Sequence, residues 1–241
     1  MRLSVIIPCK NEVGVVDTLL ASLEVQTKPA DEIIVVDSHS SDNTAEHVRK
    51  IGKRLPLIVT SASKKGVAEA RNHGGYKATS DILLFLDADA DIAPDFLENF
   101  LYDKQRRSLQ AGGFTQRMPS KNLGLRIGAR VMNGYARTMS HTPWPIAFSI
   151  IFTDSDIFRK LNGFDPEIFI MEDYDYVYRA KKQGFHVGII GTPFIASDRR
   201  YIGPDKPPLW QGIYAELYRY THGMRITKPL FTYTMGGKKK Q

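Results

Sequence analysis

The chain has 241 residues, of which 42% are hydrophobic and 24% charged, and its formal net charge is +7. This composition is ordinary for a folded globular protein, and the single cysteine, Cys9, excludes an internal disulfide bond and a cysteine-based zinc cluster. The apolar start is too short for a signal peptide, and no stretch reaches the roughly 18 apolar residues of a membrane span. We therefore expect a soluble or surface-bound protein in the cytoplasm, and the basic charge favours anionic partners such as nucleotides, phospholipid surfaces or nucleic acids.

The first 110 residues alternate between short apolar strands and amphipathic helices. Strands are predicted at 3–7, 33–36, 57–59 and 82–86, and helices at 13–25, 41–50 and 66–76, with another helix starting near Pro94. The strands are rich in valine, isoleucine and leucine, which is typical of strands that are buried on both faces. The alternation predicts an α/β fold with a doubly wound, mostly parallel sheet.

The pattern is looser after about residue 110. A strand is predicted at 112–117, helices at 123–139 and 172–182, a strand at 185–190 and an amphipathic helix within 209–222. We expect one domain over residues 1–241. Its first half covers 1–110, its second half covers 111–200, and a helical, basic tail covers 201–241.

The helix predicted at 123–139 carries apolar residues at a spacing of four, with three arginines off that row. The row consists of Leu123, Ile127, Val131 and Tyr135. This helix and the tail helix would suit a membrane surface. Packing against the sheet is the favoured interpretation.

Three alternating acids, Asp87, Asp89 and Asp91, directly follow the apolar run at 82–86. Open α/β sheets bind ligands outside the carboxyl ends of their strands, and crowded carboxylates repel each other unless a cation joins them. A hard divalent metal that carries phosphates is the favoured occupant. The alternatives are solvated acids that cap the next helix and a calcium loop, although Ile92 stands where such a loop needs glycine.

Two further residues of the first half are candidates for nucleotide binding. Asp37 ends the second strand, where a carboxylate accepts hydrogen bonds from a base edge or a ribose. A turn-forming aspartate is the alternative, and the polar residues at 40–44 are interpreted as turn and cap residues. Arg71 lies on the third helix and would reach a phosphate or a base carbonyl, with surface solvation as the alternative.

The second half offers an acidic pair and a charged island. Glu172 and Asp173 begin a helix, so one of them would cap it while the other faces a substrate as general base; a plain pair of first-turn acids is the alternative. The island is Asp198-Arg199-Arg200, where paired arginines would suit a pyrophosphate. An outward-facing charged loop is the other interpretation of the island.

Together these segments resemble family 2 glycosyltransferases of the GT-A fold, with five motifs in the family's order between about residues 3 and 185. The segment SVIIPCKNE at 4–12 resembles the family's opening strand, and VVDSHSSDNT at 35–44 its second motif. The segment at 66–72 is similar to G-x-x-x-A-R-N, and FLDAD at 85–89 to the metal-binding DXD signature. The acceptor-side block is matched by GFD at 163–165 with EDYD at 172–175.

The chain departs from the family pattern at three places. Ser38 stands where many members have a second aspartate, and His39 replaces a usual glycine. Where many members place a metal-ligating histidine, this chain has the island that begins at Asp198. The Gln-x-x-Arg-Trp motif of processive polysaccharide synthases is absent, which favours transfer of a single sugar.

The resemblance implies an inverting, metal-dependent transfer of a sugar from a nucleoside-diphosphate sugar, such as a UDP- or GDP-sugar, to an acceptor hydroxyl. Asp173 would be the catalytic base. The cofactor would be Mg²⁺ or Mn²⁺, held by Asp89, with Asp87 and Asp198 as further candidates. The halves at 1–110 and 111–200 would then bind the nucleotide sugar and the acceptor.

The remaining roles follow from the same resemblance and from the charges. The donor-binding residues would be Pro8, Asn11, Glu12, Asp37, Arg71, Asp87, Ala88 and Asp89. On the acceptor side we expect Glu172 and Trp144, and at the diphosphate Arg199 and Arg200. The basic tail, with Lys238-Lys239-Lys240, suggests an acceptor on a lipid carrier at the cytoplasmic face of a membrane.

Three other classes of protein share some of these features. A sugar-nucleotide nucleotidyltransferase would need a glycine-rich, arginine-containing loop after the first strand, where this chain has Pro8-Cys9-Lys10-Asn11. A nucleic-acid-binding module fits the net charge, but no motif of the usual modules is present, so no nucleic-acid partner is expected. A non-catalytic protein that binds nucleotide sugars is the third alternative.

Overall fold

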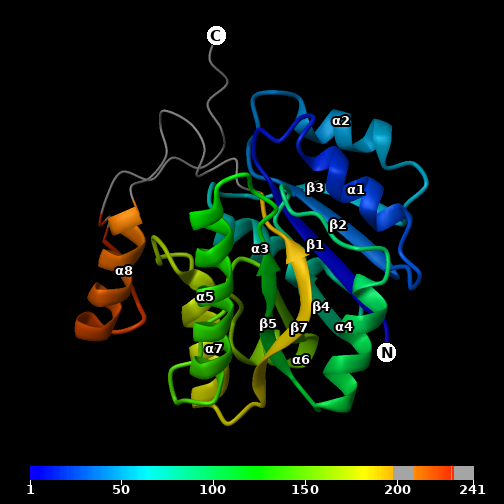
Figure 1. Cartoon of the computed structure of the whole chain (residues 1–241). Coiled ribbons are helices and arrows are strands. Elements are labelled where there is room, and N and C mark those ends of the chain that lie inside the picture. Colours follow the sequence, from blue (N-terminus) through cyan, green and yellow to red (C-terminus); the bar gives the residue numbers. More distant parts are fainter. Residues whose placement is uncertain (198–208, 229, 231–241) are drawn as a thin grey trace.

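The computed structural model describes residues 1–197, 209–228 and 230. These residues form one seven-stranded sheet with the strand order β3-β2-β1-β4-β6-β5-β7 (Figure 1). Only β6 pairs antiparallel to its neighbours within this described part of the chain; the other pairings are parallel. The mostly parallel, doubly wound α/β sheet predicted from the sequence is confirmed.

The strands begin and end close to the predicted limits in the first half of the chain. Their bounds are β1 Leu3–Cys9, β2 Glu32–Asp37, β3 Leu57–Ser61, β4 Ile82–Phe85, β5 Ala111–Arg117, β6 Ile151–Asp154 and β7 Val187–Ile195. The central strands β1, β2 and β4 are buried on both faces, as their unbroken apolar runs predict.

The described residues form eight helices, and the first seven of them cover the two faces of the sheet. Their bounds are α1 Val16–Glu24, α2 Thr44–Ile51, α3 Val67–Lys77, α4 Phe96–Arg106, α5 Leu123–Ser140, α6 Ser155–Lys160, α7 Glu172–Lys182 and α8 Leu209–His222. One core cluster packs α1, α2 and α4 on the first face, and a second packs α3, α5, α6 and α7 on the other. No helix in the described ranges combines the length and the apolar character needed to cross a membrane.

Hydrogen bonds explain where two predicted limits were wrong. The helix predicted from residue 13 begins only at Val16, because the amides of Val15 and Val16 bond to the carbonyl of Glu12 in a turn. The strand predicted from 185 begins at Val187. There the amides of Gly184 and Phe185 bond back to Lys181 and Ala180 and so close α7, with Gly184 at φ +87°.

The predicted packing of α5 against the sheet is confirmed, since this helix contacts β5 and β7, but its apolar row does not make the contact. Leu123, Ile127 and Val131 are exposed, whereas the buried residues of this helix are Ala129, Ala136, Met139 and Ser140. Small residues allow the helix to approach β5 and β7 closely, and this contact turns the larger row outward. The side of α5 that packs on the sheet is therefore not the side that carries the row of apolar residues spaced by four.

Candidate active site

The candidate site lies at the edge of the sheet where β1, β2, β4, β5 and β7 end, since these strands run in the same direction. The loops after β1 and β2 are tied to each other there. The amide of Asn11 donates to Ser40 Oγ at 3.0 Å, the amide of Glu12 donates to Thr44 Oγ1 at 3.0 Å, and Asn11 Oδ1 accepts from the amide of Ser41 at 2.8 Å. The polar residues at 40–44 thus tie the two loops together, but the expected capping by this segment is not seen: the N-cap residue of α2 is Asn43, whose side chain makes no capping hydrogen bond.

Asp37 ends β2 beside Cys9 of β1 and is 9% exposed. Its Oδ2 accepts a hydrogen bond from the amide of Ser40 at 3.3 Å, but its buried Oδ1 has no hydrogen-bond partner among the described residues. A buried acceptor without a partner costs about 1–3 kcal/mol. The position is therefore ready to receive a donor N–H or O–H from a bound molecule.

The acids after β4 are arranged by backbone contacts. The amide of Ala90 bonds to the carbonyl of Asp87 at 3.0 Å, and Asp91 forms a two-way backbone bridge with Ile195 at the end of β7 (3.0 and 2.8 Å). Asp95 is the N-cap residue of α4, so the three acids do not cap that helix. The bridge leaves Asp91 to hold the loop to the sheet, while the side chains of Asp87 and Asp89 are partly exposed.

Arg71 connects the loop after β4 to the start of α7. It lies on α3 and is only 2% exposed, which rules out surface solvation. Its Nη2 donates to Asp87 Oδ1 at 3.0 Å and its Nη1 to Glu172 Oε1 at 2.6 Å. The two carboxylates raise the pKa of the guanidinium against the effect of burial. In this structure Arg71 is engaged with these carboxylates, so it positions both acids.

Asn72, the next residue, fastens α3 to the loop before α7. Its Nδ2 donates to the carbonyl of Phe164 at 2.7 Å, and its Oδ1 accepts from the amide of Phe164 at 2.8 Å. The side chain thereby pairs with the backbone as a strand would. Gly163 has φ +69°, and a Cβ atom there would lie 2.3 Å from Asn72 Oδ1, so the close approach requires glycine.

Asp173 is held by the loop that precedes β6. The backbone amide of Ser149 donates to its Oδ2 at 2.7 Å, and the amide of Tyr174 donates to its Oδ1 at 3.0 Å. Ser149 itself has φ +52°, and its carbonyl accepts from Arg71 Nη2 at 2.9 Å. Neither acid of the pair caps α7, whose N-cap residue is Met171.

Burial and the neighbouring charge of Glu172 raise the pKa of Asp173 to about 7, while Arg71 and the two backbone amides act in the opposite direction. A carboxylate with a pKa near neutrality accepts a proton far more readily than an ordinary aspartate does. Asp173 therefore has the pKa of a candidate base, and its neighbour Glu172 is linked to Asp87 through Arg71.

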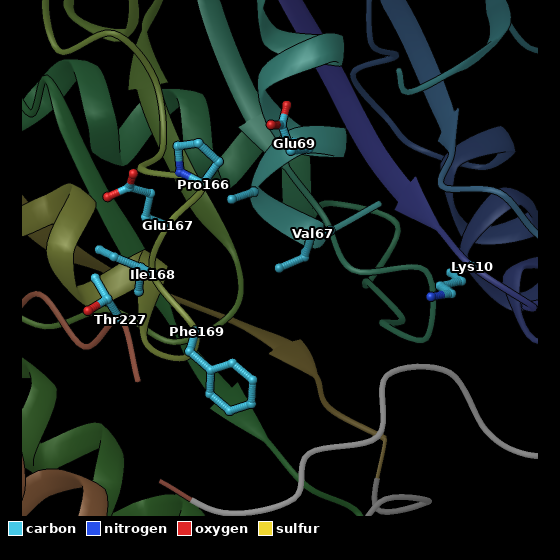
Figure 2. Close-up of a pocket in the computed structure, with 10 residues that line it drawn as sticks. Lys10, Val67, Glu69, Pro166, Glu167, Ile168, Phe169 and Thr227 are labelled. Carbon is cyan, nitrogen blue, oxygen red and sulfur yellow. The ribbon is translucent and has the colours of Figure 1, made fainter. Parts of the chain in front are cut away.

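A cleft of about 450 Å³ lies between the start of α3 and the loop at 166–169 (Figure 2). Figure 2 shows the ring of Phe169 on one side and Val67 and Lys10 on the other. Glu69 and Glu167 add carboxylates to the apolar wall. An aromatic ring with scattered carboxylates suits a polyhydroxylated ligand, which presents both C–H faces and hydroxyl groups.

For the other predicted site residues the structure gives a position but no contact that indicates a role. Trp144 is 52% exposed in the loop that leads from α5 to Ser149, and Ala88 is buried between the two acids that flank it. Pro8 lies within β1, in register with Val36 of β2. Asp198, Arg199 and Arg200, together with Lys238, Lys239 and Lys240, lie outside the described residues.

Among residues 1–197, 209–228 and 230, no group of three or more acidic, histidine or cysteine side chains is placed to hold a metal ion. Asp87 and Asp89 nevertheless fit Mg²⁺ or Mn²⁺. Such ions bind through one or two carboxylates, with substrate phosphates and waters completing the shell.

Sequence reasoning missed the amide of Ser149, because a backbone donor leaves no signal in residue type. It also missed the link of Asn72 to Phe164, although Asn72 belongs to a motif that was recognised. The residues of the cleft at 166–169 form part of the connection between the last two motifs and carry no motif of their own.

Comparison with known proteins is consistent with this geometry. Among solved structures, the mannosyltransferase PcManGT from Pyrobaculum calidifontis, in complex with GDP-Man and Mn²⁺, matches with a TM-score of 0.72 at 23% identity, over 92% of this chain and 70% of that one. TarS 1-349 of Staphylococcus aureus in complex with UDP matches with a TM-score of 0.66 at 20% identity, over 82% of this chain and 60% of that one. At these identities the likeness establishes the GT-A fold alone.

Sequence relatives and a family model identify the family as well as the fold. An uncharacterised glycosyltransferase of Haemophilus influenzae is 27% identical over 73% of this chain and 61% of its own length. The amylovoran biosynthesis glycosyltransferase AmsB of Erwinia amylovora is 28% identical over 79% of this chain and 67% of its own. This chain thus spans about two thirds or less of these relatives. The model of glycosyl transferase family 2 matches residues 4–144, more than half of the chain, and the chain therefore belongs to that family.

Proposed function

We propose that the protein transfers a sugar from a nucleoside-diphosphate sugar to an acceptor hydroxyl, with inversion at the anomeric carbon and with help from a divalent metal. The observation that supports this most directly is the chain of contacts from Asp87 through Arg71 to Glu172, next to Asp173. It fixes a donor-side acid and a base of raised pKa in one rigid frame. Residues 1–110 would bind the donor and 111–200 the acceptor.

The donor would lie along the ends of β1, β2 and β4. Its base would satisfy the buried Oδ1 of Asp37, with Pro8, Asn11 and Glu12 in the neighbouring loop. Asp87 and Ala88 would lie by the ribose. The relatives in solved structures were bound to UDP and to GDP-Man, so UDP- and GDP-sugars are the donors to test first.

Asp89, with Asp87 and Asp198 as further candidates, would hold Mg²⁺ or Mn²⁺. When bound, the ion would neutralise charge that develops on the leaving diphosphate. Arg199 and Arg200 would add positive charge to the same group.

Asp173 would carry out the proton transfer. Its carboxylate removes the proton of the acceptor hydroxyl while that oxygen bonds to the anomeric carbon from the face opposite the diphosphate. The bond from the anomeric carbon to the diphosphate oxygen breaks, and the electron pair leaves with the diphosphate. A single displacement inverts the anomer and needs no protein nucleophile.

The acceptor would enter along the cleft at 166–169, with Glu172 and Trp144 on its side of the site. A carbohydrate hydroxyl, free or on a lipid carrier, is the acceptor class that we propose. Phe169 would stack on a sugar ring there.

A thermal-shift panel of UDP-, GDP- and dTDP-sugars, each with and without Mn²⁺, would test the donor proposal, because a ligand of the native state raises its stability. We expect one nucleotide class to raise the melting temperature, and to do so more strongly with Mn²⁺. NMR of the product from that donor would give its anomeric configuration. A retained configuration would contradict the mechanism, and binding without turnover would favour the non-catalytic alternative.

A further inference from the structure

The solvent-facing side of α5 carries apolar side chains that have no role in the proposed sugar transfer. Leu123, Ile127 and Val131 are 59%, 49% and 63% exposed. Their spacing of four places them in one row along the helix, so the row forms a continuous apolar stripe of more than two turns on the surface. An exposed stripe of this kind marks an interaction surface.

A basic stripe runs beside the apolar one. Arg126, Arg130 and Arg137 are exposed and fall at spacings of four and seven on the adjoining side of α5. No aspartate or glutamate occurs between Asp103 and Asp154, so no acid of this segment offsets them. We name the six residues of the two stripes the α5 face.

Helix α8 extends the α5 face. It lies beside α5 in Figure 1, and the hydroxyl of Tyr220 bonds to that of Tyr135 on α5 at 2.7 Å. Leu217 and Tyr220 are 61% and 58% exposed. The one acid of α8, Glu216, is paired with Arg219 at 2.7 Å and adds little free negative charge to the surface.

The α5 face lies near the sheet edge that carries the candidate site. Strand β5 runs parallel to β4, because both pair antiparallel with β6. The end of β5 is therefore at the same edge of the sheet as Asp87, and α5 starts six residues after β5 ends, at Leu123. A surface that binds the α5 face would meet the molecule next to the edge where the site opens.

We propose that the α5 face, together with the exposed side of α8, docks this protein on an anionic lipid bilayer. Apolar side chains would enter the boundary between headgroups and acyl chains, and the arginines would pair with lipid phosphates above them. A protein partner with an apolar groove is disfavoured, because the three arginines would then need acids placed opposite to each of them. The proposal is independent of the sugar-transfer reaction and would stand if that reaction were not found.

Vesicle co-sedimentation of the whole protein tests the proposal. We expect binding to vesicles of phosphatidylcholine mixed with phosphatidylglycerol to exceed binding to phosphatidylcholine alone by about tenfold or more, and to fall with added salt. Ile127→Glu and the double reversal Arg126→Glu/Arg130→Glu should each remove this preference. Equal binding to the two vesicle types, or none to either, would overturn the proposal.

The chain offers matched controls on the other face of the sheet. Val25, just after α1, is 60% exposed, so Val25→Glu introduces the same charge at a similarly exposed apolar position. Lys50 and Lys53 are exposed at and after the end of α2, so Lys50→Glu/Lys53→Glu matches the double reversal in charge. Both controls should bind vesicles as the wild type does. If they lose binding equally, net charge and not the α5 face is responsible, and the proposal fails.

A fluorescent probe would separate the bilayer from other occupants. Cys9 is buried, so an environment-sensitive thiol dye can be placed at Val131→Cys, with Tyr102→Cys on α4 as the control. We expect a blue shift at position 131 only when anionic vesicles are added. Emission that is already blue-shifted in their absence would show that the chain's own segments or a second copy cover the row, and light scattering would distinguish these two results; either one overturns the proposal.

Discussion

The backbone amide of Ser149 donates a hydrogen bond of 2.7 Å to Oδ2 of Asp173, across 24 residues of sequence. The carbonyl of the same residue accepts from Arg71, so one peptide segment contacts both the proposed base and the buried cation. This segment holds the carboxylate in one orientation in spite of its partial exposure. The geometry that makes Asp173 a candidate base is thus supplied by backbone atoms as much as by side chains.

The first prediction concerns the pH dependence of sugar transfer. Because the pKa of Asp173 is raised to about 7, the carboxylate form needed by a base is lost as the pH falls through that value. We expect kcat/KM to rise with pH to a plateau above about 7, and Asp173→Asn to lower the plateau by roughly 10²–10⁴. Initial rates at limiting acceptor and saturating donor would measure both. A profile that is flat from pH 5 to pH 9 would contradict the assignment.

The second prediction concerns stability. The pKa of Asp173 lies at about 7 in the folded protein and at an ordinary 3.8 when the chain is unfolded, so between these values the folded state holds a proton that the unfolded state has lost. Raising the pH through this window therefore lowers the free energy of unfolding. Asp173→Asn should gain stability relative to the wild type at pH 8, by about 1–2 kcal/mol after allowance for solvent screening, and little at pH 4.

Urea unfolding at the two pH values measures this difference. Asp156→Asn is the matched control, since Asp156 is an exposed acid paired only with Lys160 four residues away. Its stability relative to the wild type should change far less between pH 4 and pH 8. An Asp173→Asn variant that is less stable than the wild type at pH 8 would show that ionisation of this carboxyl stabilises the fold.

The third prediction concerns Arg71. Arg71→Ala would leave Asp87 and Glu172 as close carboxylates without their shared cation, and breaking a buried pair in this way costs about 3–5 kcal/mol. Arg54→Ala is the control, because the side chain of Arg54 is 85% exposed in its pair with Glu24 and such pairs contribute about 0–1 kcal/mol. Denaturant unfolding of both variants gives the comparison. Equal losses would contradict the central role of Arg71.

The fourth prediction concerns the link between α3 and the loop before α7. Asn72→Ala removes the hydrogen-bond partners of both the N–H and the C=O of Phe164, and leaving a buried backbone donor and acceptor unpaired costs about 2–4 kcal/mol. Asn99→Ala removes a partly exposed asparagine whose side chain bonds to the exposed Asp95, and it should change the unfolding free energy by less than about 0.5 kcal/mol. If Asn72→Ala is as stable as Asn99→Ala, the link does not hold the loop.

The sheet and its first four strands were predictable, because runs such as the one at 82–86 are apolar without interruption and end at polar turns. The antiparallel strand Ile151–Asp154 was not, since a four-residue apolar segment carries no direction. Periodicity also misdirected α5. The period of four identifies the apolar row of this helix. Alanines nevertheless allow a helix to approach a sheet more closely than leucines do, so the alanine side packs inward and the apolar row is exposed.

The sequence names the residues of the candidate site, but it does not predict how they are connected. Asp37, Arg71, Asp87, Glu172 and Asp173 were all identified from motifs, but spacing alone assigned Arg71 to a phosphate or a base. The structure shows that it bonds to Glu172, which is 101 residues away. A contact of this length depends on how two halves of the fold pack, and neither local pattern nor residue type reveals it.

The last prediction concerns Asp37, whose buried Oδ1 has no partner in the described part of the structure. Without nucleotide, Asp37→Ala should cost the fold little, because the buried Oδ1 makes no hydrogen bond and Oδ2 accepts only one, of 3.3 Å, from the amide of Ser40. With nucleotide, the variant should lose at least about tenfold in affinity, since a donor group of the base would then lack its acceptor. Calorimetric titration with UDP and GDP would measure this loss for whichever nucleotide binds the wild type. Asp31→Ala is the control, because that carboxylate bonds to the amide of Leu3 at the opposite end of β1. Wild-type affinity in Asp37→Ala would show that the base is bound elsewhere.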